Sequence, residues 1–264
     1  MKENWLGVKA LFAASLLCST GQLLPEPLVN LHDLALPSEN LEDSYSELME
    51  LPLGLHLIEP RSDKVNRILI AIHDENTDGF EWTLPLQTMD DESTDTFFIR
   101  WDPSECPNST NEEVRQDIST LLNSNESINQ VTIVGHGMGG VYLSQFARSW
   151  KALIRLDGHV VAAPLNGTVG VFGDGECGDI LPKRLPPTIR IFQWRIDPLQ
   201  HSLFKEMNED PQVVDLDGSL VISLPEAIDQ NSLDSIRALE IVASRIQAEY
   251  LEAIEHSEPV EMQP

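Results

Sequence analysis

The sequence predicts an α/β fold in which helices cover both faces of a mostly parallel central sheet. From about residue 53 onward, short and almost continuously apolar segments alternate with segments of helical periodicity. Strands that are apolar on both sides are typical of parallel sheets buried between two helical layers. The chain has 264 residues, 41% of them hydrophobic, which is enough for one such domain with a sizeable core.

The expected strands and helices alternate along the chain. The strands cover residues 55–59, 67–73, 96–101, 130–134, 158–163, 188–195 and 219–224, the last of them closing the sheet. The helices cover residues 111–122, 140–150 and 233–255. Asn111 is placed at the start of the first helix because Glu112 and Glu113 then lie in its first turn, where negative charge favours the helix dipole.

The N-terminal segment has the pattern of a secretory signal. Lys2 and Lys9 supply positive charge around a short apolar core at residues 10–17, and cleavage is simplest after Thr20. The apolar run is too short to span a bilayer. An apolar helix belonging to the fold is the alternative, because Glu3 weakens the charged leader. We expect an exported protein, periplasmic or extracellular.

The chain divides by composition into four parts. We expect a signal peptide at residues 1–20, an N-terminal arm at 21–52, an α/β domain at 53–256 and a tail at 257–264. The arm is rich in Leu, Pro and acidic side chains, which is typical of an extended segment or a short helix leading into the domain. Residues 164–187 form a Gly-rich excursion within the domain.

Two cysteines remain once the expected leader is removed. Cys106 and Cys177 are an even pair in an exported chain, which favours one disulfide between them. Two unpaired thiols in loops are the alternative. The Cys and His residues do not show the spacing of zinc ligands, so we expect neither a metal nor a cofactor.

The charge balance restricts the classes of partner. The net charge is −26, from 43 acidic and 17 basic residues. Nucleic acids and anionic membranes need cationic contacts, so the sequence argues against both. Solubility is the simplest role of such an acidic surface.

Residues 131–140 carry the most informative motif, V-T-I-V-G-H-G-M-G-G. A β-branched strand runs into a tight, Gly-rich turn, as in the nucleophile elbow G-x-S-x-G. Gly135 and Gly139 are the outer glycines, and Gly137 stands where that pattern has its serine. We expect His136, at the first variable position, to pack away from the tip of the turn.

With this turn and four further segments, the chain resembles the α/β-hydrolase superfamily, and within it secreted bacterial lipase- and esterase-like members. The resemblance covers roughly residues 65–254. Residues 68–74 (I-L-I-A-I-H-D) resemble the strand leading to the oxyanion loop, and residues 160–168 (V-V-A-A-P-L-N-G-T) resemble a lipase strand ending in Ala-Pro. Residues 189–198 lie where the acid-bearing strand should be, and residues 219–233 resemble the final strand and histidine loop.

The resemblance implies a Ser-acid-His triad, and two of its three positions are changed. The nucleophile position is Gly137, which has no side chain, and the histidine position is Gln230, whose amide is no base near neutral pH. Asp197 is the candidate acid, with a loop or helix-capping aspartate as the alternative. We interpret the three positions as a degenerate triad.

The oxyanion loop also departs from the family. Asp74 follows His73 where members usually carry Gly, and its carboxylate is expected to repel a developing negative oxygen. Met138 remains able to offer its backbone N–H to such an oxygen.

The sequence therefore predicts a pseudo-hydrolase that binds a ligand or regulates a partner rather than turning over a substrate. A small apolar or ester-like ligand is expected, with residues 164–187 placed where lipases carry a lid. The alternative is an active serine esterase or lipase whose triad is not recognised, with His201 or His159 supplying the imidazole. Ser144 lies seven residues past Gly137 on the following helix and cannot replace its missing nucleophile.

Overall fold

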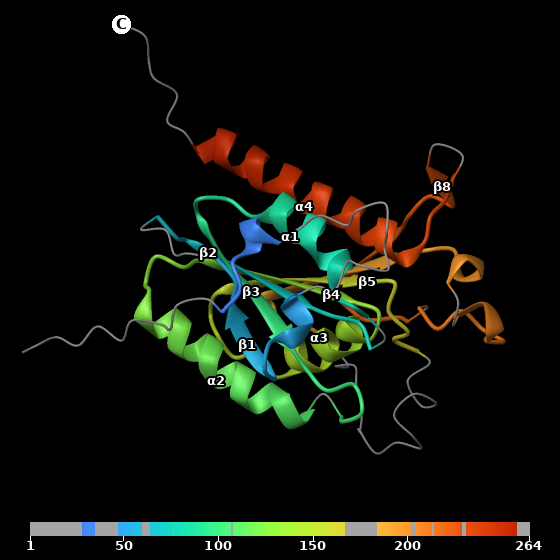
Figure 1. Cartoon of the computed structure of the whole chain (residues 1–264), viewed down its shortest axis with the longest axis horizontal. Coiled ribbons are helices and arrows are strands. Elements are labelled where there is room, and N and C mark those ends of the chain that lie inside the picture. The colour runs from blue at the N-terminus through green and yellow to red at the C-terminus, as the bar shows by residue number, and fades with distance from the viewer. Residues whose placement is uncertain are drawn as a thin grey trace, which may run out of the picture.

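The structure is a computed structural model and contains one large sheet between two helical layers (Figure 1). It describes residues 28–34, 47–59, 64–75, 77–106, 108–166, 184–201, 204–212, 214–228 and 231–257. The predicted α/β architecture with helices on both faces is confirmed.

The large sheet has seven strands, six of which run parallel. They are β1 (Gly54–Leu57), β2 (Arg67–Ile72), β3 (Thr94–Arg100), β4 (Gln130–His136), β5 (Arg155–Val161), β6 (Ile189–Arg195) and β7 (Ser219–Ser223). Their order is β1-β3-β2-β4-β5-β6-β7, and only β1 pairs antiparallel, with β3. Strand β2 is buried along its whole length, as its unbroken apolar run predicts.

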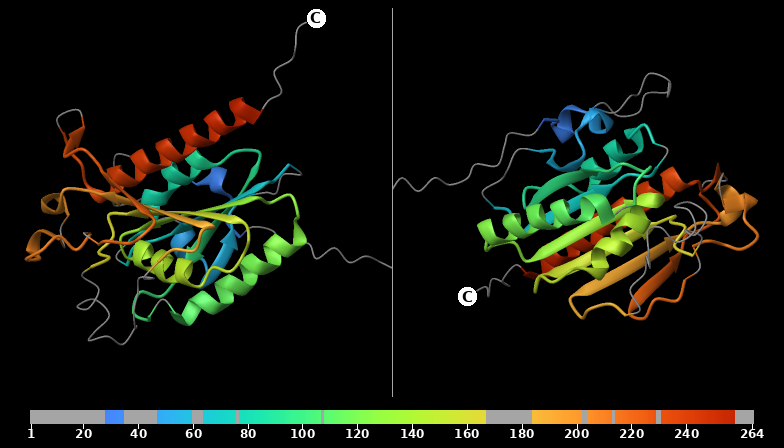
Figure 2. Two further views of the ribbon diagram at one scale, coloured as in Figure 1. Left: turned by 180° about the vertical axis from the view of Figure 1, so that it is seen from behind. Right: turned by 90° about the horizontal axis from the view of Figure 1, so that it is seen from below.

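The helices form two layers (Figure 1, Figure 2). Helices α1 (Thr83–Met89) and α4 (Ser235–Ser257) cover one face of the sheet, and α2 (Asn108–Ser124) and α3 (Met138–Arg148) cover the other. Each face has its own apolar cluster, one around Trp82 and Leu239, the other around Tyr142 and Val114. None of the described helices is both long enough and apolar enough to cross a membrane.

Described parts of the predicted N-terminal arm pack against the domain. Leu31 in the 3-10 helix η1 (Leu31–Asp33) and Leu48 in η3 (Glu47–Glu50) are fully buried in the same cluster as α1 and α4. The Leu31 N–H also donates to the Ile58 carbonyl (2.5 Å).

Several element boundaries differ from the sequence prediction. Helix α2 begins at Asn108 rather than Asn111, and α3 begins at Met138 rather than at residue 140. The early start of α3 was missed because glycine is a poor helix former. The sequence did not predict helix α1 or the hairpin formed by β8 (Ala227–Ile228) and β9 (Asn231–Ser232), which follows the strand expected to be last. The helix has only seven residues and each strand of the hairpin two, which is too short for a hydrophobic period to be recognised.

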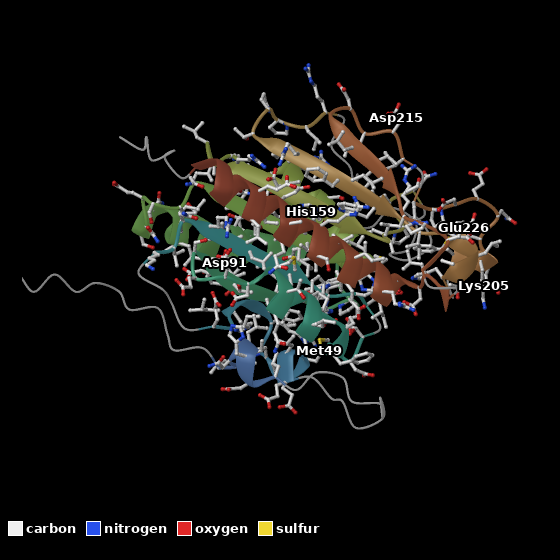
Figure 3. The ribbon with its side chains drawn as sticks, turned by 90° about the horizontal axis from the view of Figure 1, so that it is seen from above. Met49, Asp91, His159, Lys205, Asp215 and Glu226 are labelled. Carbon is white, nitrogen blue, oxygen red and sulfur yellow. The ribbon has the colours of Figure 1, made fainter. Side chains whose placement is uncertain are left out.

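At the amino ends of the strands, arginines pair with two carboxylates, those of Asp91 and Asp157. Arg67 forms an ion pair with Asp91, and Asp157 accepts hydrogen bonds from Arg155 and Arg190. In Figure 3, the label of Asp91 marks the end of the sheet where the parallel strands begin, and Lys205 lies near the opposite end. Buried ions keep their charge when such partners and hydrogen bonds replace water. Asp91 and Asp157 are therefore compensated by positive charge.

Gly139 allows the first turn of α3 to lie against the end of β2. A Cβ built on Gly139 would overlap the backbone of Ile72 and His73, neither of which can rotate away. We expect Gly139→Ala to lower the free energy of unfolding by about 1–3 kcal/mol, because overpacking outweighs the gain of about 1 kcal/mol in helix propensity. Urea denaturation measures this, with Ser244→Ala on the exposed side of α4 as the control. An unchanged Gly139→Ala midpoint would contradict the close packing.

Candidate functional site

The strand β4 ends in a sharp turn whose central residue is Gly137. Its backbone has φ 52° and ψ −120°, and helix α3 begins at the next residue. Few side chains tolerate a positive φ, and glycine adopts it freely. The Gly137 N–H donates to the Val161 carbonyl (2.9 Å), and the Gly137 carbonyl accepts from the Gly140 N–H (3.0 Å). Hydrogen bonds to the end of β5 and to the first turn of α3 therefore hold the turn in place.

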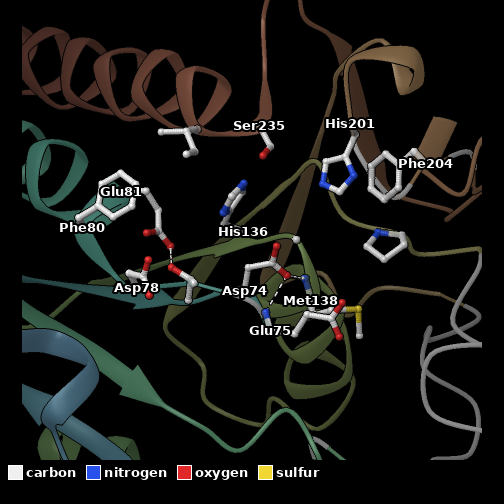
Figure 4. A pocket seen from close by; sticks show the side chains of 14 residues that line it. Asp74, Glu75, Asp78, Phe80, Glu81, His136, Met138, His201, Phe204 and Ser235 are labelled. Atoms are coloured by element: carbon white, nitrogen blue, oxygen red, sulfur yellow. Dashed lines mark hydrogen bonds between the residues drawn. The ribbon is translucent and has the colours of Figure 1, made fainter. Parts of the chain in front are cut away.

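The carboxylate of Asp74 occupies the space above Gly137. A Cβ built on Gly137 would overlap the Asp74 carboxyl group. One carboxylate oxygen, Oδ1, accepts the Met138 N–H (2.7 Å) and the Glu75 N–H (2.8 Å), as Figure 4 shows. A serine hydrolase of this fold would hold a negative oxygen with two backbone N–H groups. One belongs to the residue after the nucleophile, and the other belongs to the loop that corresponds to the one after β2 here. Both corresponding donors are bound to Asp74.

His73 fixes the loop that carries Asp74. Its Nε2 accepts the Trp101 backbone N–H (3.2 Å), so the Nδ1 proton is the one donated to the Asp74 carbonyl (2.6 Å). Its own carbonyl accepts the Trp101 indole N–H (2.9 Å). Burial is the main reason that the pKa of His73 falls to about 4, so the ring is neutral and keeps this tautomer.

A pocket of about 430 Å³ opens beside this turn (Figure 4). It lies beyond the carboxyl ends of the strands, where ligands bind in open α/β sheets. Its lining comes from the loop after β2, the 3-10 helix η4 (Phe80–Trp82), the turn at Gly137, the segments after β5 and β6, and the start of α4. The lining residues are Asp74, Glu75, Thr77, Asp78, Phe80, Glu81, His136, Gly137, Met138, Pro164, His201, Phe204, Ser235 and Ile236.

His136 is placed differently from the prediction. We expected its side chain to pack away from the turn, but it lines the pocket between Asp74 and Ser235 (Figure 4). The residue is 4% exposed, and neither ring nitrogen has a hydrogen-bond partner among the described residues. Buried polar atoms are nearly always hydrogen-bonded. The sequence expectation failed because it rested on the position of His136 in the motif, and a motif does not show which distant segments enclose a side chain.

Of the two histidines considered as substitutes for the missing base, only His201 lines the pocket. Its ring stacks on Phe204, with centroids 3.8 Å apart. Burial lowers the pKa of His201, although the charge of Asp74 opposes this. His159 lies inside β5, where it accepts the Trp194 indole N–H (3.1 Å), and burial lowers its pKa to about 3. His159 is therefore a core residue.

Of the two other positions of the predicted triad, the structure describes only Asp197. Asp197 caps the 3-10 helix η6 (Pro198–Gln200), accepting the Leu199 N–H (3.0 Å), and is not in the pocket lining. Gln230 lies outside the described residues. Ser144 donates to the Gly140 carbonyl (2.9 Å) within α3.

Acidic residues that the sequence reasoning missed also line the pocket. Glu81 is 5% exposed and accepts the Thr77 hydroxyl. Burial and then the charge of Asp74 raise the pKa of Glu75. These residues are separated in sequence from Gly137, and no local motif indicated them.

Cys106 is disulfide-bonded. The expected partner, Cys177, lies outside the described residues, as does most of the Gly-rich excursion.

One group of side chains in the described part of the chain could hold a metal ion. His32, Glu59 and Asp90 bring their ligand atoms within 4.8 Å of one another, and His32 Nε2 lies 2.8 Å from Asp90 Oδ2. No sequence pattern indicated this group, because its members come from three distant segments. Burial, followed by the hydrogen bond with Asp90, raises the pKa of Glu59.

No family model matches the chain, and no curated protein is similar to it in sequence. Solved structures are similar in fold. Est1E from Butyrivibrio proteoclasticus has a TM-score of 0.50 at 11% identity, covering 76% of this chain and 94% of its own. The fluorophosphonate-binding serine hydrolase F from Staphylococcus aureus has a TM-score of 0.52 at 10% identity, covering 78% and 94%. The predicted α/β-hydrolase fold is confirmed.

We expect Gly137→Ser to destabilise the protein through Asp74. A serine would be strained at positive φ and would displace the carboxylate from its two N–H donors, which together cost about 2–4 kcal/mol. The loss should be smaller in an Asp74→Gly background, with a coupling energy of about 1–3 kcal/mol by urea denaturation. Additive effects, within about 0.5 kcal/mol, would rule out the contact.

Glu59→Gln should stabilise the protein in alkaline solution. The pKa of Glu59 is higher when folded than when unfolded, so its contribution to stability is lost as pH rises above about 4.5. The amide of the Glu59→Gln variant keeps an acceptor for the Thr96 N–H without an ionisable proton. The melting temperature should exceed that of the wild type by a few degrees at about pH 8.5, and by less at about pH 5.5. The substitution Glu92→Gln, at an exposed position, is the control. If the difference in melting temperature between Glu59→Gln and the wild type does not grow with pH, the Glu59 carboxyl group is not its cause.

Proposed function

We propose that this protein, which has the α/β-hydrolase fold, binds a small ligand in the pocket beside Gly137 without hydrolysing it. The proposal makes the chain a pseudo-hydrolase with a binding or regulatory role. It rests on the chemistry of the turn, because a shared fold does not by itself carry a shared activity.

The position of the Asp74 carboxylate is the observation that carries the proposal. Acyl transfer needs a nucleophile and free N–H donors for the oxygen that becomes negative. At this turn, Gly137 has no side chain, and Asp74 accepts both the Met138 and the Glu75 N–H. A substrate carbonyl would have to displace the Asp74 carboxyl group from those donors. From the sequence we expected Asp74 to repel an oxyanion. We propose a stronger obstacle, which is that the Asp74 carboxyl group occupies the position that the oxyanion would need.

An active serine esterase is the competing function. The pocket lining contains a serine and a histidine that could serve as its nucleophile and base. Ser235 and His201 both border the pocket. An alternative triad built on them would have to attack a carbonyl away from Gly137, without the two N–H groups that Asp74 holds.

An exported location is part of the proposal. The disulfide-bonded state of Cys106 supports an oxidising compartment, because structural disulfides are rare in reducing ones. The signal-like pattern of residues 1–20 is consistent with this location.

The purified protein should not hydrolyse p-nitrophenyl butyrate above the rate in buffer, and a fluorophosphonate probe should not label it. Both results follow from the missing nucleophile, since removing a catalytic serine lowers turnover by about a million-fold in subtilisin. An active serine esterase treated in parallel is the positive control. Labelling of Ser235 together with turnover that disappears in His201→Ala would establish the competing function.

A further inference from the structure

The charge of the pocket lining has one sign. Asp74, Glu75, Asp78 and Glu81 border it, and its described lining contains no Lys or Arg. Within the described residues, none of the ion pairs involves any of these four side chains. Carboxylates gathered in a concave site with low-dielectric walls concentrate cations there. This contrasts with Asp91 and Asp157 at the amino ends of the strands, each of which forms an ion pair with an Arg side chain.

His136 adds an independent sign of a ligand. Only 4% of the residue is exposed, and both ring nitrogens lack a partner among the described residues while the side chain faces the pocket. A buried imidazole without hydrogen bonds costs about 1–3 kcal/mol. A ligand that donates an N–H to one of the two ring nitrogens removes part of that cost.

The remainder of the lining can hold an apolar group. Phe80 and Phe204 border the pocket, together with Met138 and Ile236. Aromatic ring faces also attract ammonium groups. The volume of about 430 Å³ lies within the range of small-molecule sites.

An anionic ligand is disfavoured by the same geometry. The two backbone N–H groups at the turn that could bind an anion, those of Met138 and Glu75, already donate to Asp74. A carboxylate or phosphate entering the pocket would meet four acidic side chains with these donors occupied.

We infer that the pocket binds a small organic cation, an ammonium group carrying a short apolar chain. The ammonium lies among the carboxylates and donates to His136, and the chain lies against the Phe80 and Phe204 rings. This inference rests on the proposed binding function and gives its ligand a charge. It replaces the uncharged apolar or ester-like ligand expected from the sequence.

Three probes of nearly equal size and different charge test it. The protein is titrated with n-butylammonium, 1-butanol and butyrate, and binding is followed by NMR shifts of the His136 and Met138 resonances. We expect saturable binding of n-butylammonium with a dissociation constant at least about tenfold below that of 1-butanol, and no saturation by butyrate. Equal binding of the ammonium and the alcohol, or tighter binding of butyrate, would overturn the inference.

Matched variants locate the binding. Glu81→Gln keeps the size of a lining side chain and should weaken n-butylammonium about fivefold or more without changing 1-butanol. Glu126→Gln, an exposed substitution on the loop after α2, should change neither. Thermal melting establishes that both variants are folded. If Glu81→Gln binds the ammonium as the wild type does, or weakens both probes equally, the charge assignment is wrong.

The inference and the proposed function can fail separately. Ester turnover with intact selectivity for n-butylammonium would overturn the proposal of a non-catalytic protein and leave the cation site standing. Absence of turnover together with no preference for n-butylammonium would overturn the cation site and leave the proposal of a non-catalytic protein standing.

Discussion

The structure around the turn depends on one hydrogen-bonded carboxylate. Asp74 brings its Oδ1 atom to the N–H groups of Met138 and Glu75, and so joins the loop after β2 to the start of α3. Hydrogen bonds to a charged acceptor are stronger than neutral ones. Because the carboxylate fills the space above Gly137, the side chain at residue 137 and the one at residue 74 cannot be chosen independently. The two departures from an active hydrolase are thus one structural change.

This coupling explains which part of the site could be predicted from the sequence. The elbow was recognisable because its glycines follow one another within five residues of sequence, Gly135 lying against the Gly139 backbone and Gly137 having a positive φ. Asp74 was recognised as unfavourable for an oxyanion, but its hydrogen bond with Met138 could not be foreseen, since it joins residues 64 positions apart. The pocket face of His136 and the contribution of Glu81 depend on packing between distant segments, and no periodicity encodes that packing.

The fold itself was largely accessible from the sequence. Strands such as β2, buried at every position, produce unbroken apolar runs that leave little choice of architecture. Errors fell where the signal is short or the residue type misleads: in the seven residues of α1, in the two-residue strands β8 and β9, and at the glycines inside α3. The acid position stayed open for a physical reason, because a carboxylate after a strand can cap a helix, as Asp197 does for η6.

The buried leucines of the N-terminal arm have a consequence for any shortened form of the protein. Leu31 and Leu48 are as fully enclosed as the central strands, although they precede the first strand. A chain beginning at residue 53 would uncover the apolar surfaces of Trp82 and Phe98 that belong to the same cluster. Exposed apolar surface of that kind promotes self-association. The smallest well-behaved unit therefore includes Leu31, more than twenty residues before the first strand of the sheet.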